Sequence, residues 1–159
     1  MLHSKIQNPG IYVIITQPQL PYITIAEKCV ENNISMIQLR EKQLPDRELL
    51  KIAQDLRAVT RGTNTRLVIN DRPDIARLCE ADVLHLGQDD MTLKDARKIV
   101  GDIKIGLSTH SLEQARTALK QKPDYIASGL SIPPMQKPIP ILRSAQSFWQ
   151  KSWHLPMFR

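Results

Sequence analysis

The stretch from residue 67 to residue 90, LVINDRPDIARLCEADVLHLGQDD, decides the fold. It contains two short apolar runs, at positions 67–69 and at Val83–Leu86, and polar residues follow both of them. Residues 72–80 lie between the runs, carry a proline in their first turn and place apolar side chains at helical spacing, which predicts a short helix. A strand, a helix and a strand in such close succession predict a parallel crossover unit.

Carboxylates follow both of these predicted strands. The first strand runs into Asn70 and Asp71, and the second runs into a polar turn that ends at Asp90. Because the carboxyl ends of neighbouring parallel strands lie on one face, we expect the two carboxylates to point into a shared space. We expect them to have no basic partner, and two convergent carboxylates suit a hard cation such as Mg²⁺. The alternative is that each carboxylate caps the helix that follows it.

The composition fits one domain that binds small acidic ligands. The chain has 159 residues, enough for one hydrophobic core, and its formal net charge is +6. Aromatic residues make up only 4% and no lysine or arginine stripe is present, so we expect no nucleic-acid partner. Cys29 and Cys79 stand alone in helical patterns, which predicts buried free thiols in a reducing cytoplasm. The lack of a signal-peptide core or a membrane-length apolar run predicts no membrane partner.

The rest of the chain repeats the same alternation. We expect further strands at residues 11–15, 36–40 and 103–107 and from position 125 onward, and further helices near residues 24–33, 45–60, 93–100 and 111–120. The first of these strands is apolar throughout, as in a strand covered on both faces. Capping boxes are predicted for Thr24 with Glu27 and for Ser111 with Gln114, and Gly62 is expected to end the second helix.

Six apolar strands that alternate with five helices, with polar residues after every strand, are typical of a (β/α) barrel whose site lies at the carboxyl ends of the strands. A doubly wound open sheet is the second alternative. A complete barrel needs eight units and usually at least about 200 residues, yet residues 131–159 are proline-rich and show no strand–helix period. We therefore expect an α/β fold, an incomplete TIM barrel over residues 1–130, followed by an irregular tail over residues 131–159.

Five motifs resemble those of the thiamine-phosphate synthase family, a family of single-domain (β/α)₈ enzymes. They are QLREK at 38–42, ND at 70–71, HLGQDD at 85–90, GLSTHS at 106–111 and PDYIASG at 123–129. Each motif is weak alone, but their order and approximate spacing match the family from about residue 10 to residue 129. The resemblance implies a transferase of thiamine biosynthesis that condenses hydroxymethylpyrimidine diphosphate with thiazole phosphate and releases pyrophosphate.

The resemblance also implies which residues bind the substrate. Gln38 would hydrogen-bond the aminopyrimidine, and Arg40 and Lys42, on one side of their strand, would bind the diphosphate. Asn70 and Ser108 would add hydrogen bonds to the same diphosphate. Without the resemblance, a solvated strand end for Gln38 and surface salt bridges for the two cations would be the simpler interpretations.

The same resemblance assigns the metal site. Asp71 and Asp90 would hold Mg²⁺ against the diphosphate, because negative charge grows on this leaving group if its C–O bond breaks before the thiazole nitrogen attacks. No protein nucleophile or acid–base residue is then needed, and His85 and His110 are interpreted as packed or capping histidines. A related thiazole tautomerase branch shares the barrel but generally lacks these acidic residues, so the synthase is favoured.

The chain departs from the family pattern after Gly129. The family usually continues with a Pro-Ile-Tyr-like segment and a Thr-x-Thr-Lys-like turn, and Lys137 falls at the position of that substrate-binding lysine, but Pro134 and Gln136 replace the threonines. A reverse translation of residues 130–137, read in a shifted frame, permits Pro-Ile-Tyr-Ser-Thr-His-Ala-Lys. This favours a frameshifted tail. We therefore expect the chain as written to bind the pyrimidine diphosphate weakly and not to turn over thiazole phosphate.

Three functions compete at this point. The first is the synthase. The second is a non-catalytic remnant or a fragment that binds pyrimidine diphosphate, stabilised by self-association through open barrel edges or by a partner that supplies the missing strands. The third is a barrel enzyme for another phosphorylated ligand. Mg²⁺-dependent binding of the pyrimidine diphosphate, lost in Asp71→Ala, separates the first two from the third, and turnover separates the first from the second.

Overall fold

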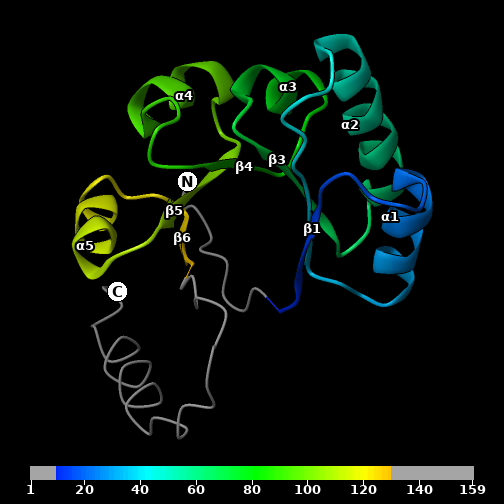
Figure 1. The fold of residues 1–159 in the computed structure, drawn as a ribbon, viewed down its shortest axis with the longest axis horizontal. Helices are drawn as coiled ribbons and strands as arrows, with labels where there is room; N and C mark the ends of the chain where they lie inside the picture. The colour runs from blue at the N-terminus through cyan, green and yellow to red at the C-terminus, as the bar shows by residue number, and fades with distance from the viewer. Residues whose placement is uncertain (1–9, 130–159) are drawn as a thin grey trace, which may run out of the picture. The chain divides into compact units, whose positions relative to one another are not determined.

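Six strands and five helices alternate along residues 10–129, which are the residues that the computed structural model describes (Figure 1). The strands are β1 (Tyr12–Ile15), β2 (Met36–Leu39), β3 (Arg66–Asn70), β4 (Val83–Leu86), β5 (Lys104–Thr109) and β6 (Tyr125–Ser128). The helices are α1 (Tyr22–Glu31), α2 (Asp46–Thr60), α3 (Pro73–Leu78), α4 (Leu93–Val100) and α5 (Leu112–Lys120). Among the described helices, none combines the length and the apolar character needed to cross a bilayer.

The strands form one parallel sheet in the order β1-β2-β3-β4-β5-β6. A doubly wound sheet reverses its direction of growth partway along, so the strictly sequential strand order excludes that alternative. Figure 1 shows a curved row of strands with the helices along its outer side. The described residues are therefore part of a barrel wall, as the alternation of strand and helix patterns predicted.

The main hydrophobic core lies between the sheet and its helices. Its fully buried strand members are Ile37, Leu39, Leu67, Ile69, Leu84, Leu86 and Ile105. The helices contribute small side chains that are also fully buried, which lets each helix approach the sheet closely: Ala26, Ala53, Ala76 and Ala96. Burying one leucine or isoleucine side chain stabilises a fold by about 1.5–3 kcal/mol, so this layer carries most of the stability.

Both cysteines lie in this core as free thiols, as their isolated positions in helical patterns predicted. Burial raises the pKa of the Cys29 thiol. Burial also raises the pKa of Cys79, to about 11. Because thiolates are the reactive species, both cysteines are structural residues here.

The opposite, inner face of the sheet carries a second, smaller cluster. Met36, Val68 and Val83 are buried there and contact Tyr12 and Tyr125. Side chains two residues apart on a strand share a face, so the residues that follow at positions 38, 70 and 85 also face the inside. The inner face is thus apolar near the amino ends of the strands and polar toward their carboxyl ends.

Two local predictions are wrong and one is confirmed. Helix α1 begins at Tyr22 behind Pro21, whose φ of −55° already suits a helix start, and no side chain caps it, so Thr24 is not a capping residue. Strand β1 is not covered on both faces, because the side chain of Ile14 stays 54% exposed. Ser111 does cap α5, since its Oγ accepts from the backbone N–H of Gln114 at 3.1 Å.

Candidate functional site

The polar residues singled out in the sequence gather at the carboxyl ends of the central strands. Gln38 lies on β2, Asn70 is the last residue of β3, and Ser108 is the next-to-last residue of β5. Asp71 directly follows β3, and Asp90 lies in the turn between β4 and α4. Since all strands are parallel and sequentially ordered, these five residues occupy one end of the sheet.

Asp71 and Asp90 do point at each other. Burial raises the pKa of Asp71, and the hydrogen-bond contact of its side chain with Asp90 and the negative charge of Asp90 raise it further. Lys42 opposes the shift, with its Nζ 3.4 Å from Asp71 Oδ2. Two carboxylates this close repel each other when both are ionised, and a divalent cation between them removes that repulsion.

The turn after β4 is shaped around Asp90. Its Oδ2 accepts a hydrogen bond from the backbone N–H of Gly87 at 2.6 Å. A Cβ atom at position 87 would lie only 2.9 Å from the same oxygen, so the close approach of this carboxylate favours glycine. The turn therefore places the carboxylate toward the strand ends, where it meets Asp71.

The turn after β3 aims Asp71 in a comparable way. Its backbone has a φ of 59°, in the left-handed region that aspartate tolerates better than most residues. The backbone N–H of Asp71 donates to the carbonyl of His85 at 2.8 Å, which ties this turn to β4. The turn that carries Asp71 is therefore fixed to the neighbouring strand β4.

The helix-capping alternative for these aspartates is wrong. Helix α3 has Arg72 at its N-cap with no side-chain cap hydrogen bond, and helix α4 is capped by Thr92, whose side chain accepts from the backbone N–H of Asp95. Neither Asp71 nor Asp90 therefore has the structural role that would most simply explain an aspartate before a helix.

The basic residues of the QLREK motif follow β2 in a loop rather than on the strand, because β2 ends at Leu39. The backbone N–H of Arg40 donates to the carbonyl of Ile15 at 2.9 Å. Glu41 fixes the loop from the other side, with Oε1 accepting from the Tyr22 hydroxyl at 2.7 Å. The loop brings Lys42 to Asp71, a basic partner 29 positions away that neighbouring sequence did not reveal.

Several side chains of the inner face form a hydrogen-bonded chain beside these aspartates. Gln38 Nε2 donates to the Tyr12 hydroxyl at 2.5 Å, and the hydroxyls of Tyr12 and Tyr125 lie 3.2 Å apart. His85 joins the chain through Nδ1, 2.9 Å from the Tyr125 hydroxyl, and through Nε2, 2.8 Å from Ser108 Oγ. The side-chain amide of Gln88 also donates to the Ser108 carbonyl.

His85 is a packed histidine, as predicted, but it also connects polar residues. Its side chain is buried, its ring stacks on Tyr125 at 5.7 Å between centroids, and burial lowers its pKa to about 4. The sequence interpretation missed Tyr12 and Tyr125. The available signal was a tyrosine at an inward position of an apolar strand, because a buried tyrosine hydroxyl normally needs a partner.

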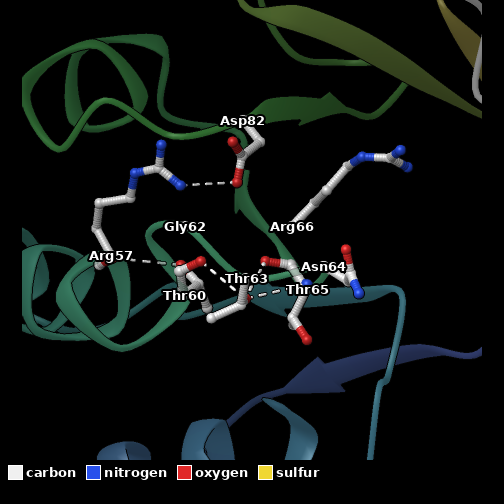
Figure 2. Close-up of a pocket in the computed structure, with 8 residues that line it drawn as sticks. All are labelled: Arg57, Thr60, Gly62, Thr63, Asn64, Thr65, Arg66 and Asp82. Atoms are coloured by element: carbon white, nitrogen blue, oxygen red, sulfur yellow. Dashed lines mark hydrogen bonds and ion pairs between the residues drawn. The ribbon is translucent and has the colours of Figure 1, made fainter.

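A separate cavity of about 260 Å³ lies at the amino end of β3, in the loop after α2 (Figure 2). Its walls are already bonded to one another: Asp82 Oδ2 accepts from Arg57 Nη1 at 2.9 Å and from the backbone N–H of Leu67 at 2.9 Å. The Thr63 hydroxyl likewise donates to the Thr60 carbonyl at 2.8 Å. None of the sequence-predicted site residues lines this cavity, so we interpret it as part of the structural framework.

The predicted metal ligands are few but of the right kind. Within residues 10–129 no group of three or more histidine, cysteine, aspartate or glutamate side chains could hold a metal ion. Mg²⁺ does not require such a group, because it is usually bound by one or two carboxylates together with waters and substrate phosphates. Asp71 and Asp90 meet that requirement, while Lys137 lies outside the described residues, as does the tail assigned to 131–159.

Comparison with known proteins gives consistent results. Residues 11–152 match the family described as thiamine monophosphate synthase. The thiamine-phosphate synthase of Prochlorococcus marinus is 40% identical over 131 residues, which cover 81% of this chain and 37% of the relative. That of Halalkalibacterium halodurans is 44% identical over 106 residues, which cover 66% of this chain and 50% of the relative.

A solved structure, thiamine phosphate pyrophosphorylase from Pyrococcus furiosus, matches with a TM-score of 0.71 and 33% identity. The match covers 79% of this chain and 62% of the other one. The chain spans about half the length of the curated relatives it matches.

Proposed function

The chain belongs to the thiamine monophosphate synthase family, and from this premise we propose that residues 10–129 supply the pyrimidine-diphosphate half of a thiamine-phosphate synthase site. The reaction would join hydroxymethylpyrimidine diphosphate to thiazole phosphate and release pyrophosphate. The observation that carries the proposal is the contact between Asp71 and Asp90 with Lys42 beside them. A like-charged pair with one nearby cation suits a ligand that brings both a metal ion and phosphate oxygens.

The diphosphate would lie between the metal ligands and the basic loop. When bound, a magnesium ion held by Asp71 and Asp90 would supply positive charge beside the leaving group. Lys42 lies at the same aspartate and would add a second cation, while Asn70 and Ser108 would donate hydrogen bonds to the phosphate oxygens. Charge complementarity of this kind is what a departing diphosphate requires, and no protein nucleophile enters the scheme.

Gln38 and Arg40 would complete the pyrimidine end. One N–H of the Gln38 amide donates to the Tyr12 hydroxyl. Its carbonyl oxygen and second N–H have no other partner within residues 10–129, and we propose that they bind the aminopyrimidine. Arg40 lies at the start of the loop that carries Lys42 and would bind the same diphosphate. We propose that Gln38 and Arg40 recognise the pyrimidine diphosphate in this way. We also propose that the protein is located in the cytoplasm.

Calorimetric titration of the full chain with hydroxymethylpyrimidine diphosphate tests the proposal. We expect binding that requires Mg²⁺ and that Asp71→Asn and Asp90→Asn each weaken roughly a hundredfold, because each removes a metal ligand. Asp89→Asn is the matched control, since Asp89 is an exposed carboxylate in the same turn and should not be a ligand. Binding that survives without Mg²⁺, or an affinity that is unchanged in Asp71→Asn, would contradict the proposal.

Turnover then separates the synthase from a binding fragment. Thiamine phosphate formed from both substrates can be detected as fluorescent thiochrome after oxidation. Product formation favours the enzyme, whereas Mg²⁺-dependent binding without product favours the fragment that binds pyrimidine diphosphate. Self-association through the edges of β1 and β6 stays a prediction, and light scattering after gel filtration tests it.

A further inference from the structure

The inner face of the sheet holds a chain of hydrogen bonds whose direction can be worked out. Five side chains from five strands take part, in the order Gln38, Tyr12, Tyr125, His85 and Ser108. The two tyrosines are 113 positions apart in the sequence, so this chain exists only in the folded protein. Its two ends, Gln38 and Ser108, are both residues that we place in the substrate site.

The direction follows from counting hydrogens, starting at Gln38. Its Nε2 can only donate, so the Tyr12 oxygen is the acceptor at this contact. The single hydroxyl hydrogen of Tyr12 then has one acceptor among the described residues, the Tyr125 oxygen. With its oxygen accepting from Tyr12, the Tyr125 hydroxyl is free to donate to His85 Nδ1.

The hydrogen bond from Tyr125 determines the tautomer of His85 and, through it, the direction of the Ser108 hydroxyl. A neutral imidazole has one N–H, and an Nδ1 that accepts leaves this hydrogen on Nε2. His85 Nε2 then donates to Ser108 Oγ, which makes the serine oxygen an acceptor on its inner side. The hydroxyl hydrogen of Ser108 has no acceptor among the described residues and remains available to a ligand.

We infer that His85, held as its Nε2–H tautomer by Tyr125, is a positioning residue that presents the Ser108 hydroxyl as a hydrogen-bond donor to a phosphate oxygen. This inference rests on the proposed function for the place of Ser108 in the site. It adds a role for three residues, Tyr12, Tyr125 and His85, that need not touch the diphosphate. Their effect is to turn the hydroxyl hydrogen of Ser108, rather than its lone pairs, toward an anion.

The opposite direction of hydrogen bonding between Ser108 and Tyr12 is less favourable for two reasons. If His85 carried its hydrogen on Nδ1, Tyr125 would have to donate to Tyr12, and the half-buried Tyr12 hydroxyl would lose its only acceptor within residues 10–129. Ser108 would then donate inward to His85 Nε2 and present only lone pairs to the ligand. Lone pairs repel phosphate oxygens, so that arrangement opposes anion binding.

The geometry also holds the rings in place. The Tyr125 ring lies directly over Gly106, where a Cβ atom would come within 2.1 Å of its Cζ, so this glycine is required for the ring to reach His85. The rings of His85 and Tyr125 are stacked with an angle of 25° between their planes. Burial raises the pKa of the Tyr125 hydroxyl, which keeps it a donor at all ordinary pH values.

Nitrogen-15 NMR of the full chain tests the tautomer without any ligand. Two-bond ¹⁵N–¹H correlations distinguish Nε2–H from Nδ1–H imidazoles, and the His85 signals are assigned by their loss in His85→Gln. We expect the Nε2–H form in the wild type and a mixture of tautomers in Tyr125→Phe, which removes the donor to Nδ1. An Nδ1–H form in the wild type, or an unchanged tautomer in Tyr125→Phe, would overturn the inference.

Binding of inorganic pyrophosphate with Mg²⁺ tests the consequence for the ligand. We expect Tyr125→Phe to weaken this affinity about tenfold, the usual effect of losing one hydrogen bond to a charged group. His85→Gln should retain most of the affinity because its terminal amide can place a donor near Ser108, whereas the shorter His85→Asn should not. Thr109→Val is the control, since it removes a buried hydroxyl hydrogen bond to the Ala127 carbonyl on the other face of β5.

The outcomes separate the two claims. Equal affinities in the wild type, Tyr125→Phe and His85→Asn would overturn the positioning role while leaving the proposed site intact. Failure of the wild type to bind pyrophosphate with Mg²⁺ would overturn the proposed site and the positioning role together. Melting temperatures and circular dichroism of each variant show whether a loss of affinity has its origin in a loss of fold.

Discussion

Aspartates occur at both ends of the sheet, and their surroundings differ. At the amino ends, Asp82 precedes β4 and Asp124 precedes β6, and each is bonded both to an arginine and to a backbone N–H of the preceding strand. Asp124 Oδ2 lies 3.2 Å from Arg97 Nη2 and 2.7 Å from the backbone nitrogen of Ile105. The same arrangement, an aspartate bonded to an arginine and to a backbone N–H, thus occurs twice, two strand–helix units apart along the chain.

The proposed metal ligands at the carboxyl ends are not balanced by an arginine in this way. Asp71 and Asp90 contact each other, and the nearest cation is the exposed Lys42 at 3.4 Å from Asp71. An aspartate's partners, rather than its place beside a strand, therefore distinguish the structural aspartates from the pair that we propose to bind a metal ion. The bonded carboxylates stabilise the barrel wall, whereas the crowded pair is the one for which we propose a metal ion.

The largest expected effect concerns His85, the buried base at the carboxyl ends. Its pKa is about 4 in the folded chain against 6.5 in an unfolded one, so below pH 6.5 the unfolded state binds the proton first. The free energy of unfolding should therefore fall as the pH is lowered from 6.5 to 4, by on the order of 3 kcal/mol from this group. Urea unfolding of the wild type and of His85→Gln across this range measures the difference.

His110→Gln provides the matched control for this experiment, because His110 is exposed. The raised pKa of Asp71 acts in the opposite direction at the lower end of the range, since the folded state then takes up a proton first. The difference between the wild type and His85→Gln isolates the histidine. An acid destabilisation that is equal in these two proteins would contradict the prediction.

The second effect is on ligand binding. Asp71→Asn should lower the affinity for Mg²⁺ and pyrophosphate by roughly a hundredfold, because it removes one of two metal ligands. Asp82→Asn should leave the affinity unchanged, since its carboxylate is at the opposite end of the strands and already bonded. Calorimetric titration of both variants measures these affinities. Similar losses of affinity in the two variants would contradict the distinction between the aspartates at the two ends of the sheet.

The third effect is on stability, and it concerns Asp82 at the amino ends of the strands. Asp82→Asn should lower the free energy of unfolding by about 2 kcal/mol, because it leaves the largely buried Arg57 guanidinium without its charged partner. Urea unfolding at neutral pH measures the change. A double-mutant cycle with Arg57→Met shows whether the pair itself is responsible, in which case the two single losses will not add.

The smallest effect has the opposite sign. Asp71→Asn should raise the free energy of unfolding by about 0.5 kcal/mol in metal-free buffer, because it removes repulsion from Asp90. Asparagine also tolerates the left-handed backbone at this position, so no strain is added. A variant that is less stable than the wild type under these conditions would show that the carboxylate is structural after all.

Much of the fold could be predicted because it depends on local patterns. The run Val83–Leu86 was placed at its observed bounds, and the other five strands were placed within a few residues of theirs. Local patterns failed where a neighbouring segment decided the outcome. Pro21 started α1 ahead of the expected cap at Thr24, and the exposure of β1 depends on which strands flank it, which periodicity does not encode.

The candidate site could likewise be predicted only where it depends on local patterns and on the crossover rule. The crossover rule was sufficient to expect Asp71 and Asp90 on one face, and their mutual contact fits that expectation. Their relation to Lys42 was not visible, because it depends on how the loop after β2 turns. The hydrogen bond between Tyr12 and Tyr125 was equally hidden, because it depends on how far the sheet curves.

The sequence by itself determined the alternation of strand and helix, the polar ends of the strands and the family to which they belong, because each of these depends on residues close together in the chain. Tertiary structure alone decided which aspartates are balanced by arginine, which are left crowded, and which way the hydrogen bonds run from Gln38 to Ser108. The physical reason is that burial and hydrogen-bond direction are properties of groups brought together from distant positions. A carboxylate or an imidazole acquires its function from those neighbours.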